Sequence, residues 1–210
     1  MSGYSPIART GSLMKPLGGS TMTRMVILLA SMLLVACSGT PVQTQYYLLR
    51  SDLEQTSRDL APSKNFAMGR IMIAPYIEQP GIVLETARGE VRPALHHQWA
   101  EPMRQGLQQF LRVEVSDAAG EDIFPEDISE GEFIFEVRID QLHGTVDGDA
   151  TLVAYWLIRR DREIISTHQF SDREPLGTDG YGALARAEKE LLSQLAGRIA
   201  RTLKEAAAAS

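Results

Sequence analysis

The cysteine and histidine side chains that could act as a nucleophile or a metal ligand are few: one cysteine and four histidines in 210 residues. Cys37 cannot form an internal disulfide, because the chain has no second cysteine. His96 and His97 are adjacent, so they point to opposite faces of a strand or differ by about 100° on a helix, and neither geometry suits a shared metal. His143 and His168 are isolated, and we interpret them as strand-edge or interface residues. The sequence therefore predicts no metal site and no bound cofactor.

Acidic residues offer the other candidate chemistry. Glu132, Glu136 and Asp140 recur at strand spacing on one polar face. A solvated face is the first interpretation, and a pair of catalytic carboxylates, as in a hydrolase, is a weaker one. Residues 177–182, rich in glycine, are interpreted as a turn and helix cap in preference to an anion-binding loop. The motifs G-x-S-x-G, G-x-x-x-x-G-K-[ST] and H-E-x-x-H do not occur, so we predict that the protein is not an enzyme.

The segment before Cys37 gives this cysteine a different chemistry. Residues 25–35 are an apolar run of the length of a secretory signal core, too short to span a bilayer as a helix. Residues 1–36 contain no Asp or Glu, and their basic residues are Arg9, Lys15 and Arg24. The run ends in Leu34-Val35-Ala36-Cys37, which matches a bacterial lipobox. We predict cleavage between Ala36 and Cys37 and a covalent lipid on Cys37; the alternative is an ordinary buried cysteine.

Cleavage would leave a mature chain of 174 residues with 18 basic and 27 acidic side chains, a net charge of −9. Neither this charge nor the −6 of the whole chain gives an electrostatic reason to expect nucleic acid as a partner. Ser38 follows the cysteine, where Asp would signal retention in the inner membrane, so we predict the periplasmic face of the outer membrane. Met22 alone would begin a complete signal, and it is an alternative start that leaves the mature protein unchanged.

The elements that must carry these residues follow from hydrophobic periodicity. After a lipidated tether of residues 37–45, aromatic and aliphatic residues predict a strand over 46–49. Residues 51–65 are polar and predict a loop, and residues 70–74 predict a buried strand closed by a proline. A hairpin is predicted from residues 82–86 and 90–92, joined by a three-residue turn that contains Gly89.

The second half of the chain changes period twice. Residues 100–111 follow helical spacing with Pro102 in the first turn, and residues 117–130 predict a polar connection. Three strands with short turns then predict an antiparallel meander; they cover residues 133–140, 151–159 and 163–170. An amphipathic helix is predicted from about residue 180 to 205, followed by a frayed tail over 206–210.

These elements predict a single α+β or mixed α/β domain over residues 46–205, with a largely antiparallel sheet, an internal helix and a long C-terminal helix. No break in composition and no repeat divides this range.

Several short motifs in a fixed order carry a resemblance to a known family. They are the lipobox, Tyr46-Tyr47-Leu48, the strand ending in Ala74-Pro75, the hairpin before Trp99-Ala100-Glu101-Pro102-Met103, the strand around Tyr155-Trp156 and the C-terminal helix. With them the chain resembles the ABC-type transport auxiliary lipoproteins of the paraquat-inducible protein C group over essentially all of residues 34–205.

The resemblance implies a non-enzymatic outer-membrane lipoprotein. Its partners would be a periplasmic MCE-domain protein and an inner-membrane ABC permease and ATPase that move lipids between the membranes and support envelope integrity. Only Cys37 carries over as a defined site. Exposed strand edges and the aromatic residues Tyr47, Trp99 and Trp156 are candidate contacts, and core packing is the favoured interpretation of all three aromatics. A homo-oligomer stays open, as does a second function, a lipoprotein activator or partner of the peptidoglycan-synthesis machinery.

Overall fold

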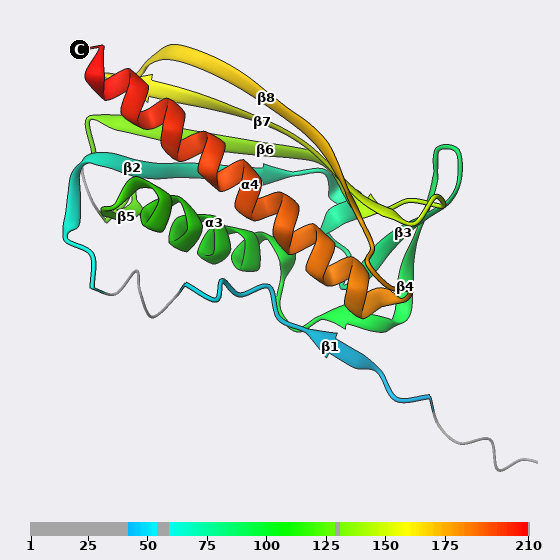
Figure 1. Cartoon of the computed structure of the whole chain (residues 1–210). Coiled ribbons are helices and arrows are strands. Elements are labelled where there is room, and N and C mark those ends of the chain that lie inside the picture. Colours follow the sequence, from blue (N-terminus) through cyan, green and yellow to red (C-terminus); the bar gives the residue numbers. More distant parts are fainter. Residues whose placement is uncertain (1–41, 54–58, 129–130, 210) are drawn as a thin grey trace, which may run out of the picture. The chain divides into compact units, whose positions relative to one another are not determined.

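The computed structural model describes residues 42–53, 59–128 and 131–209 (Figure 1). Cys37, Ala36 and the predicted signal lie outside the described residues, as does most of the predicted tether. Residues Gln43–Ser210 form one compact unit. Its helices are η1 (Pro75–Glu78, a 3-10 helix), α3 (Met103–Ala119) and α4 (Tyr181–Ala208), and its strands are β1 (Gln45–Tyr47), β2 (Pro62–Ile73), β3 (Gly81–Ala87), β4 (Glu90–Trp99), β5 (Asp122–Pro125), β6 (Phe133–Gly144), β7 (Asp149–Arg160) and β8 (Glu163–Pro175).

The longest ladders of the sheet form the antiparallel meander β6–β7–β8. The period-two pattern predicted it, because alternate residues of β6 are apolar and lie in the core. The turn between β7 and β8 consists of Asp161 and Arg162, both at positive φ, the conformation whose twist suits a two-residue hairpin. This part of the prediction is confirmed, and β7 and β8 extend beyond the predicted ranges.

Two parallel strands share the other edge of β6 in succession. β2 pairs with it from Phe66 opposite Phe133 to Ile73 opposite Ile139, and β3 reaches it at Gly144. The helix η1 connects β2 to β3, and its Tyr76 hydroxyl accepts a hydrogen bond of 3.1 Å from the amide of Leu142 in β6. The Tyr76 hydroxyl therefore satisfies a backbone amide of β6 at a position where neither β2 nor β3 pairs with that strand.

The predicted loop over residues 51–65 and the predicted connection over 117–130 are each wrong in part. β2 begins at Pro62, inside the first segment, and β5 lies inside the second. The two pair with each other in parallel, with Ala67 opposite Phe124. Each segment has few apolar residues, and partners distant in the sequence stabilise both strands, so local periodicity carried no signal for them.

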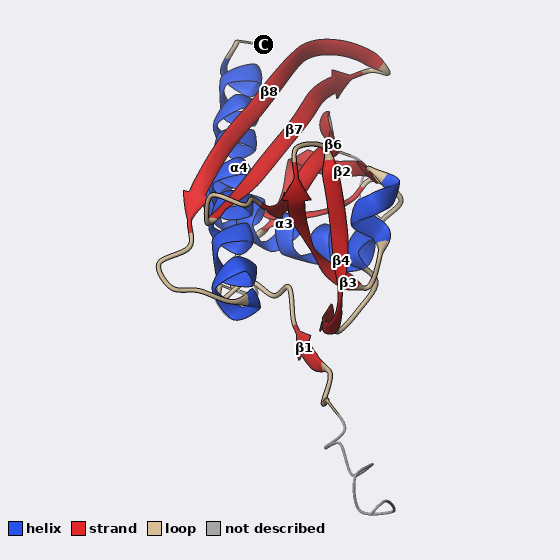
Figure 2. Ribbon diagram, turned by 90° about the vertical axis from the view of Figure 1, so that its right-hand side faces the viewer, coloured by secondary structure: helices blue, strands red, loops and turns tan. Residues whose placement is uncertain are grey.

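Both long helices lie on the same side of the sheet (Figures 1 and 2). α3 continues eight residues beyond the predicted end at 111, because Val113 and Val115 are still buried, and Gly120 at φ +82° ends it. α4 reaches Ala208, so the predicted frayed tail is helical almost to its end; its Ala206 and Ala207 pack against the core. The predicted helix 100–111 is thereby corrected to Met103–Ala119, with Pro102 at the N-cap position and not in the first turn, and most of the predicted tail belongs to α4.

The predicted hairpin is confirmed as β3 and β4, with two changes. Ala87 pairs with Glu90, so the turn has two residues, Arg88 and Gly89, in place of three. β4 continues to Trp99 and pairs in parallel with β1, Gln45 lying opposite His97. β1 is thereby an edge strand.

The fold class is confirmed: one domain with a mixed sheet of eight strands, an internal helix and a long C-terminal helix. The parallel pairs at β1, β2, β3 and β5 are the part that strand periodicity could not predict. No helix within the described ranges is long and apolar enough to cross a bilayer.

Candidate functional site

Strand β1, at the end of the predicted tether, is bound into the fold by a cluster of aromatic rings. The Tyr47 hydroxyl lies 3.0 Å from Nδ1 of His97 in β4 and 3.0 Å from Oε1 of Gln45. His97 in turn stacks on Tyr181, the first residue of α4, with ring centroids 4.3 Å apart. We call these four residues the tether junction. They join β1 to β4 and to the start of α4.

The residues that follow β1 strengthen this connection. Leu49 is buried in the core, and a Cβ on Gly106 of α3 would lie 3.5 Å from Leu49 Cβ. Arg50 forms an ion pair with Glu101, with one contact of 2.7 Å, and the amide of Ala100 donates to the Tyr47 carbonyl at 2.7 Å. The chain that leads from Cys37 is therefore an integral part of the domain from Gln45 onward.

The three aromatic residues predicted as contacts differ in exposure. Trp99 is 6% exposed and Trp156 is 5% exposed, so both side chains are buried, as core packing requires. The Trp156 indole donates to Thr202 of α4 at 3.0 Å and stacks on His168. Tyr47 is half-buried in the tether junction. No described partner tests any of the three as a contact residue.

The side of the sheet away from the helices has a hollow of about 460 Å³. Because Phe135, Val137 and Ile158 face the helices, the intervening residues of β6 and β7 face the hollow. Its lining includes Met72, Glu136, Arg138, Tyr155, Leu157 and Gln169. We call this side the open face.

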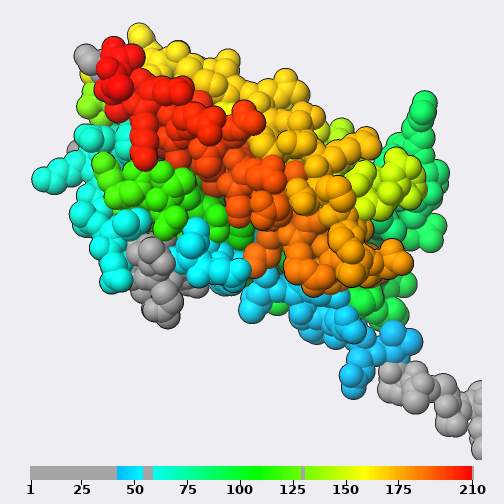
Figure 3. Space-filling model, in the orientation of Figure 1, coloured from blue at the N-terminus to red at the C-terminus, as the bar shows by residue number. Residues whose placement is uncertain are grey.

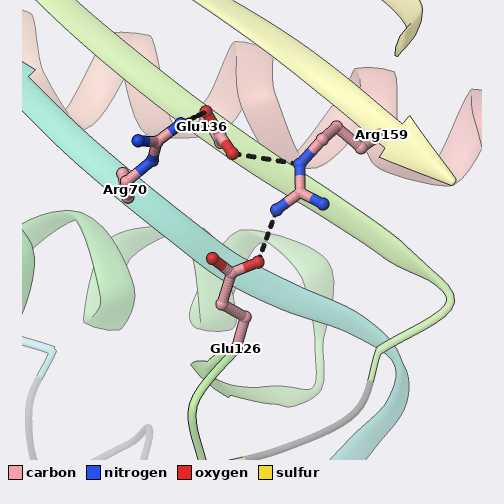
Figure 4. A network of polar contacts seen from close by, with 4 residues as sticks. All are labelled: Arg70, Glu126, Glu136 and Arg159. Carbon is pink, nitrogen blue, oxygen red and sulfur yellow. Dashed lines mark hydrogen bonds and ion pairs between the residues drawn. The ribbon is translucent and has the colours of Figure 1, made fainter. Parts of the chain in front are cut away.

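Glu136 at the open face is held by arginines from two neighbouring strands (Figure 4). Arg159 Nε lies 3.0 Å from one carboxylate oxygen, and Arg70 lies 3.6 Å from the other. Arg159 also reaches Glu126 at 2.5 Å, from the segment after β5. The network thereby connects β2, β6 and β7 with that segment on the side opposite α4.

Glu136 is 7% exposed, so the prediction of a solvated face is wrong for this residue. Its side chain lies over Gly69, where an added Cβ would come within 2.8 Å of Glu136 Cγ. Glu132 pairs with Arg160 at 2.5 Å, and Asp140 with Arg138 at 2.6 Å. Each of the three carboxylates thus has an arginine partner, which is the arrangement of an ion-paired surface and not of a free acid and base.

Burial shifts the pKa of three side chains: Tyr76 in η1, His143 in β6 and Glu188 in α4. Tyr76 lies 3.0 Å from His143 Nδ1, and burial raises the pKa of Tyr76 and lowers that of His143. His143 is 8% exposed and lies in β6, which pairs with β7 on one side and with β2 and β3 on the other, so the strand-edge interpretation is wrong for this residue. Burial raises the pKa of Glu188 on α4 to about 8. These groups belong to the core and its border, not to the hollow.

The remaining candidates have structural places. His96 is exposed and His97 belongs to the tether junction, so the adjacent histidines do not converge. Gly180 precedes α4 at φ +99° and its carbonyl accepts from the amides of Ala183 and Leu184, as a turn and cap would. Among residues 42–53, 59–128 and 131–209, no three His, Cys, Asp or Glu side chains are grouped as metal ligands.

A family of known proteins matches this fold and sequence. Residues 46–200 match the family of the ABC-type transport auxiliary lipoprotein component. The chain belongs to this family. The match begins at β1, confirms the resemblance seen in the sequence, and identifies the protein as an auxiliary lipoprotein of intermembrane or ABC-type transport rather than a member of an enzyme family.

Individual proteins are also similar to this chain, one in sequence and two in fold. The Intermembrane transport lipoprotein PqiC of Escherichia coli (strain K12) is 21% identical over 185 residues, covering 87% of this chain and 98% of that protein. A crystal structure of an uncharacterized protein has a TM-score of 0.66 at 20% identity and covers 77% of this chain and 99% of that one. The protein XCC0632 from Xanthomonas campestris has a TM-score of 0.58 at 14% identity, covering 77% and 93%. These two structures share the fold.

Sequence reasoning missed two parts of this auxiliary lipoprotein. It gave no role to His97 and Tyr181, because the tether junction needs the parallel pairing of β1 with β4. It also missed the partners of Glu136, although Arg159 was the available signal: in an antiparallel pair, residues near the same register face the same side.

Proposed function

We propose that this auxiliary lipoprotein is a non-catalytic adaptor, anchored in the outer membrane through a lipid on Cys37. The observation that carries the proposal is that the family match begins at Tyr46 in β1, nine residues after Cys37, where the tether junction joins the chain to β4 and α4. A lipid anchor eight residues before β1 would therefore confine the whole domain to the membrane surface. Confinement raises its effective concentration for a partner that crosses the periplasm.

The partner we propose is a periplasmic MCE-domain protein, which works with an inner-membrane ABC permease and ATPase. The relative named as an intermembrane transport lipoprotein supports this assignment. In such a system the adaptor would receive the outer-membrane end of the partner, and its loss would weaken the envelope. The exposed edge strand β8 is available for strand addition.

Two variants test the anchor and its membrane separately. Cys37→Ala removes the lipid, and Ser38→Asp keeps the lipid but directs retention in the inner membrane. We expect both to give folded proteins that fail to restore the envelope resistance of a deletion strain. Full function of the unlipidated Cys37→Ala protein would show that the anchor is dispensable, and full function of Ser38→Asp at the inner membrane would reject the outer-membrane assignment.

Co-purification distinguishes the proposed partner from the alternative one. The lipidated protein is extracted in mild detergent and its bound proteins are identified. An MCE-domain protein is expected in the eluate of the wild type. A peptidoglycan synthase in its place would overturn the transport assignment in favour of an activator of cell-wall synthesis.

A further inference from the structure

Three large apolar side chains are exposed where the predicted tether enters the domain. Tyr46 in β1 is 65% exposed, Leu48 just after it is 59% exposed, and Leu95 in β4 is 79% exposed. We call these three residues the β1–β4 corner. Leu95 lies two residues before His97, which pairs with Gln45, so the three belong to adjoining segments. Figure 3 shows the blue segment around β1 on the surface beside the orange start of α4.

The tether junction fixes which side chains of β1 face outward. Tyr47 and Leu49 point into the domain, to His97 and to the core respectively. Tyr46 and Leu48 alternate with them and are therefore directed to solvent. Leu95 lies where the pairing of β4 with β3 is irregular, between Pro93 opposite Val83 and Gln98 opposite Gly81. The corner is thus built by ordered segments on both sides.

The segments that form the corner carry no ionised side chain. Residues 38–49 and 93–100 contain no Asp, Glu, Lys or Arg, in a chain with 21 basic and 27 acidic residues. The free-energy cost of moving a surface from water into an apolar environment is lowest when no charged group has to be desolvated. Tyrosine and leucine are also the kind of side chains that settle at the boundary between lipid headgroups and acyl chains.

The length of the preceding chain decides which uncharged environment lies within reach. Tyr46 follows Cys37 by nine residues, which span at most about 32 Å when fully extended. A lipid embedded at Cys37 therefore keeps the corner within about 30 Å of the headgroups, a distance similar to the thickness of the hydrocarbon core of a bilayer. The lipid fixes only one point of the chain, so a second apolar contact nearby would also fix how the domain lies on the membrane.

We propose that the β1–β4 corner is a membrane-contact surface, which lies on the lipid headgroups and inserts Tyr46, Leu48 and Leu95 at their boundary with the acyl chains. The proposal rests on the proposed lipid anchor at Cys37. It gives the domain a fixed orientation, with β1 and the start of α4 toward the bilayer. The end of the sheet that holds β5 and the turn between β7 and β8 then points into the periplasm (Figure 1).

The single cysteine makes this orientation measurable, because lipidation would consume its thiol. In the lipidated protein, Tyr46→Cys, Leu48→Cys and Leu95→Cys would each provide one thiol for an environment-sensitive fluorophore. Ile128→Cys and Ile164→Cys are matched controls, because both side chains are exposed, at 72% and 58%, and lie at the other end of the sheet. Vesicles of phosphatidylethanolamine and phosphatidylglycerol contain nitroxide-labelled lipid as the quencher.

We expect the three corner probes to be quenched by the labelled lipid and the two controls to keep their emission. Equal quenching in both sets, or in neither, would overturn the proposal. Emission that shifts with protein concentration but is not quenched by lipid would also overturn it, by showing that a second copy covers the corner. Flotation of the same samples tests the anchor. Protein that floats without quenching of the corner probes refutes the contact surface alone. If the protein isolated from cells carries no lipid on Cys37 and does not float, the anchor is refuted as well.

Discussion

Strand β6 has two faces made of alternate residues, and different chemistry stabilises each of them. On the helix-covered face Phe133, Phe135, Val137 and Ile139 are at most 2% exposed and pack under α3 and α4. On the open face Glu136, Arg138 and Asp140 form ion pairs around a hollow. The first face owes its stability to dispersion and the exclusion of water, whereas the second depends on a few directed contacts.

The same residue type shows the difference in another way. Glu136 on the open face lies between Arg159 and Arg70, so its charge is compensated. Glu188 on α4 is 2% exposed among the apolar residues that pack toward the sheet, and burial raises its pKa to about 8. The two carboxyl groups thus differ in their surroundings: Glu136 lies beside two arginines, whereas burial favours the neutral form of Glu188.

Truncation of the helix-covered face should have the largest effect. Phe135 is fully buried, and Phe135→Ala would remove its transfer free energy and leave a cavity. We expect the free energy of unfolding to fall by about 3–5 kcal/mol, measured by urea denaturation followed by circular dichroism. Phe135→Leu is the conservative control and should lose clearly less. An equal loss in both would mean that ring packing on this face is not what stabilises it.

The neutral carboxyl of Glu188 should make stability depend on pH. Its pKa is near 4.5 when unfolded and about 8 when folded, so the folded state binds an additional proton between these values. The stabilisation is complete below pH 4.5 and is lost as the pH rises toward 8. From pH 5.5 to 7.5 we expect a loss of about 3 kcal/mol, at about 1.4 kcal/mol per pH unit.

The measurement compares urea unfolding of the wild type and Glu188→Gln across that pH range. The difference between the two curves isolates Glu188 from other titrating groups, such as His143, whose pKa burial lowers. A difference curve that stays flat would show that burial does not raise the pKa of Glu188 in the folded protein.

Removal of one arginine should weaken the open face by a smaller amount. Arg159→Met would leave Glu136 with only the 3.6 Å contact to the exposed Arg70. We expect a loss of about 1–3 kcal/mol, less than for a fully buried pair because the Arg159 side chain is 21% exposed. Adding Glu136→Gln to Arg159→Met should restore part of it. Arg138→Met, on the same face but far more exposed, is the control and should leave the unfolding midpoint unchanged.

The two faces also differ in how far the sequence predicted them. The apolar alternation of Phe133, Phe135, Val137 and Ile139 predicted β6 and the side that it buries, because burial acts on each residue separately. The same alternation placed Glu136 on the polar side. It could not show that Gly69 leaves room for the Glu136 side chain or that Arg159 forms an ion pair with it. That arrangement depends on the parallel pairing of β2 with β6, which has no local pattern.

The predicted candidate site shows the same limit. Cys37 could be assigned from the sequence because a lipobox is local, and it stays a prediction since it lies outside the described residues. Tyr47 was singled out as an aromatic contact, yet its partner His97 and the Tyr181 ring that stacks on His97 come from segments 50 and 134 residues away. Contacts of this kind follow from the assembled sheet and cannot be deduced from spacing.

A polar contact on the helix-covered face provides the smallest test. Trp156 is 5% exposed, and its indole donates to Thr202 of α4 at 3.0 Å. Thr202→Val keeps the shape but leaves this donor without its acceptor, so we expect a loss of about 1 kcal/mol in urea unfolding. Thr202→Ser retains the hydroxyl and should lose less. If Thr202→Val and Thr202→Ser unfold alike, the hydrogen bond adds nothing beyond packing, and the helix-covered face is stabilised by apolar contacts alone.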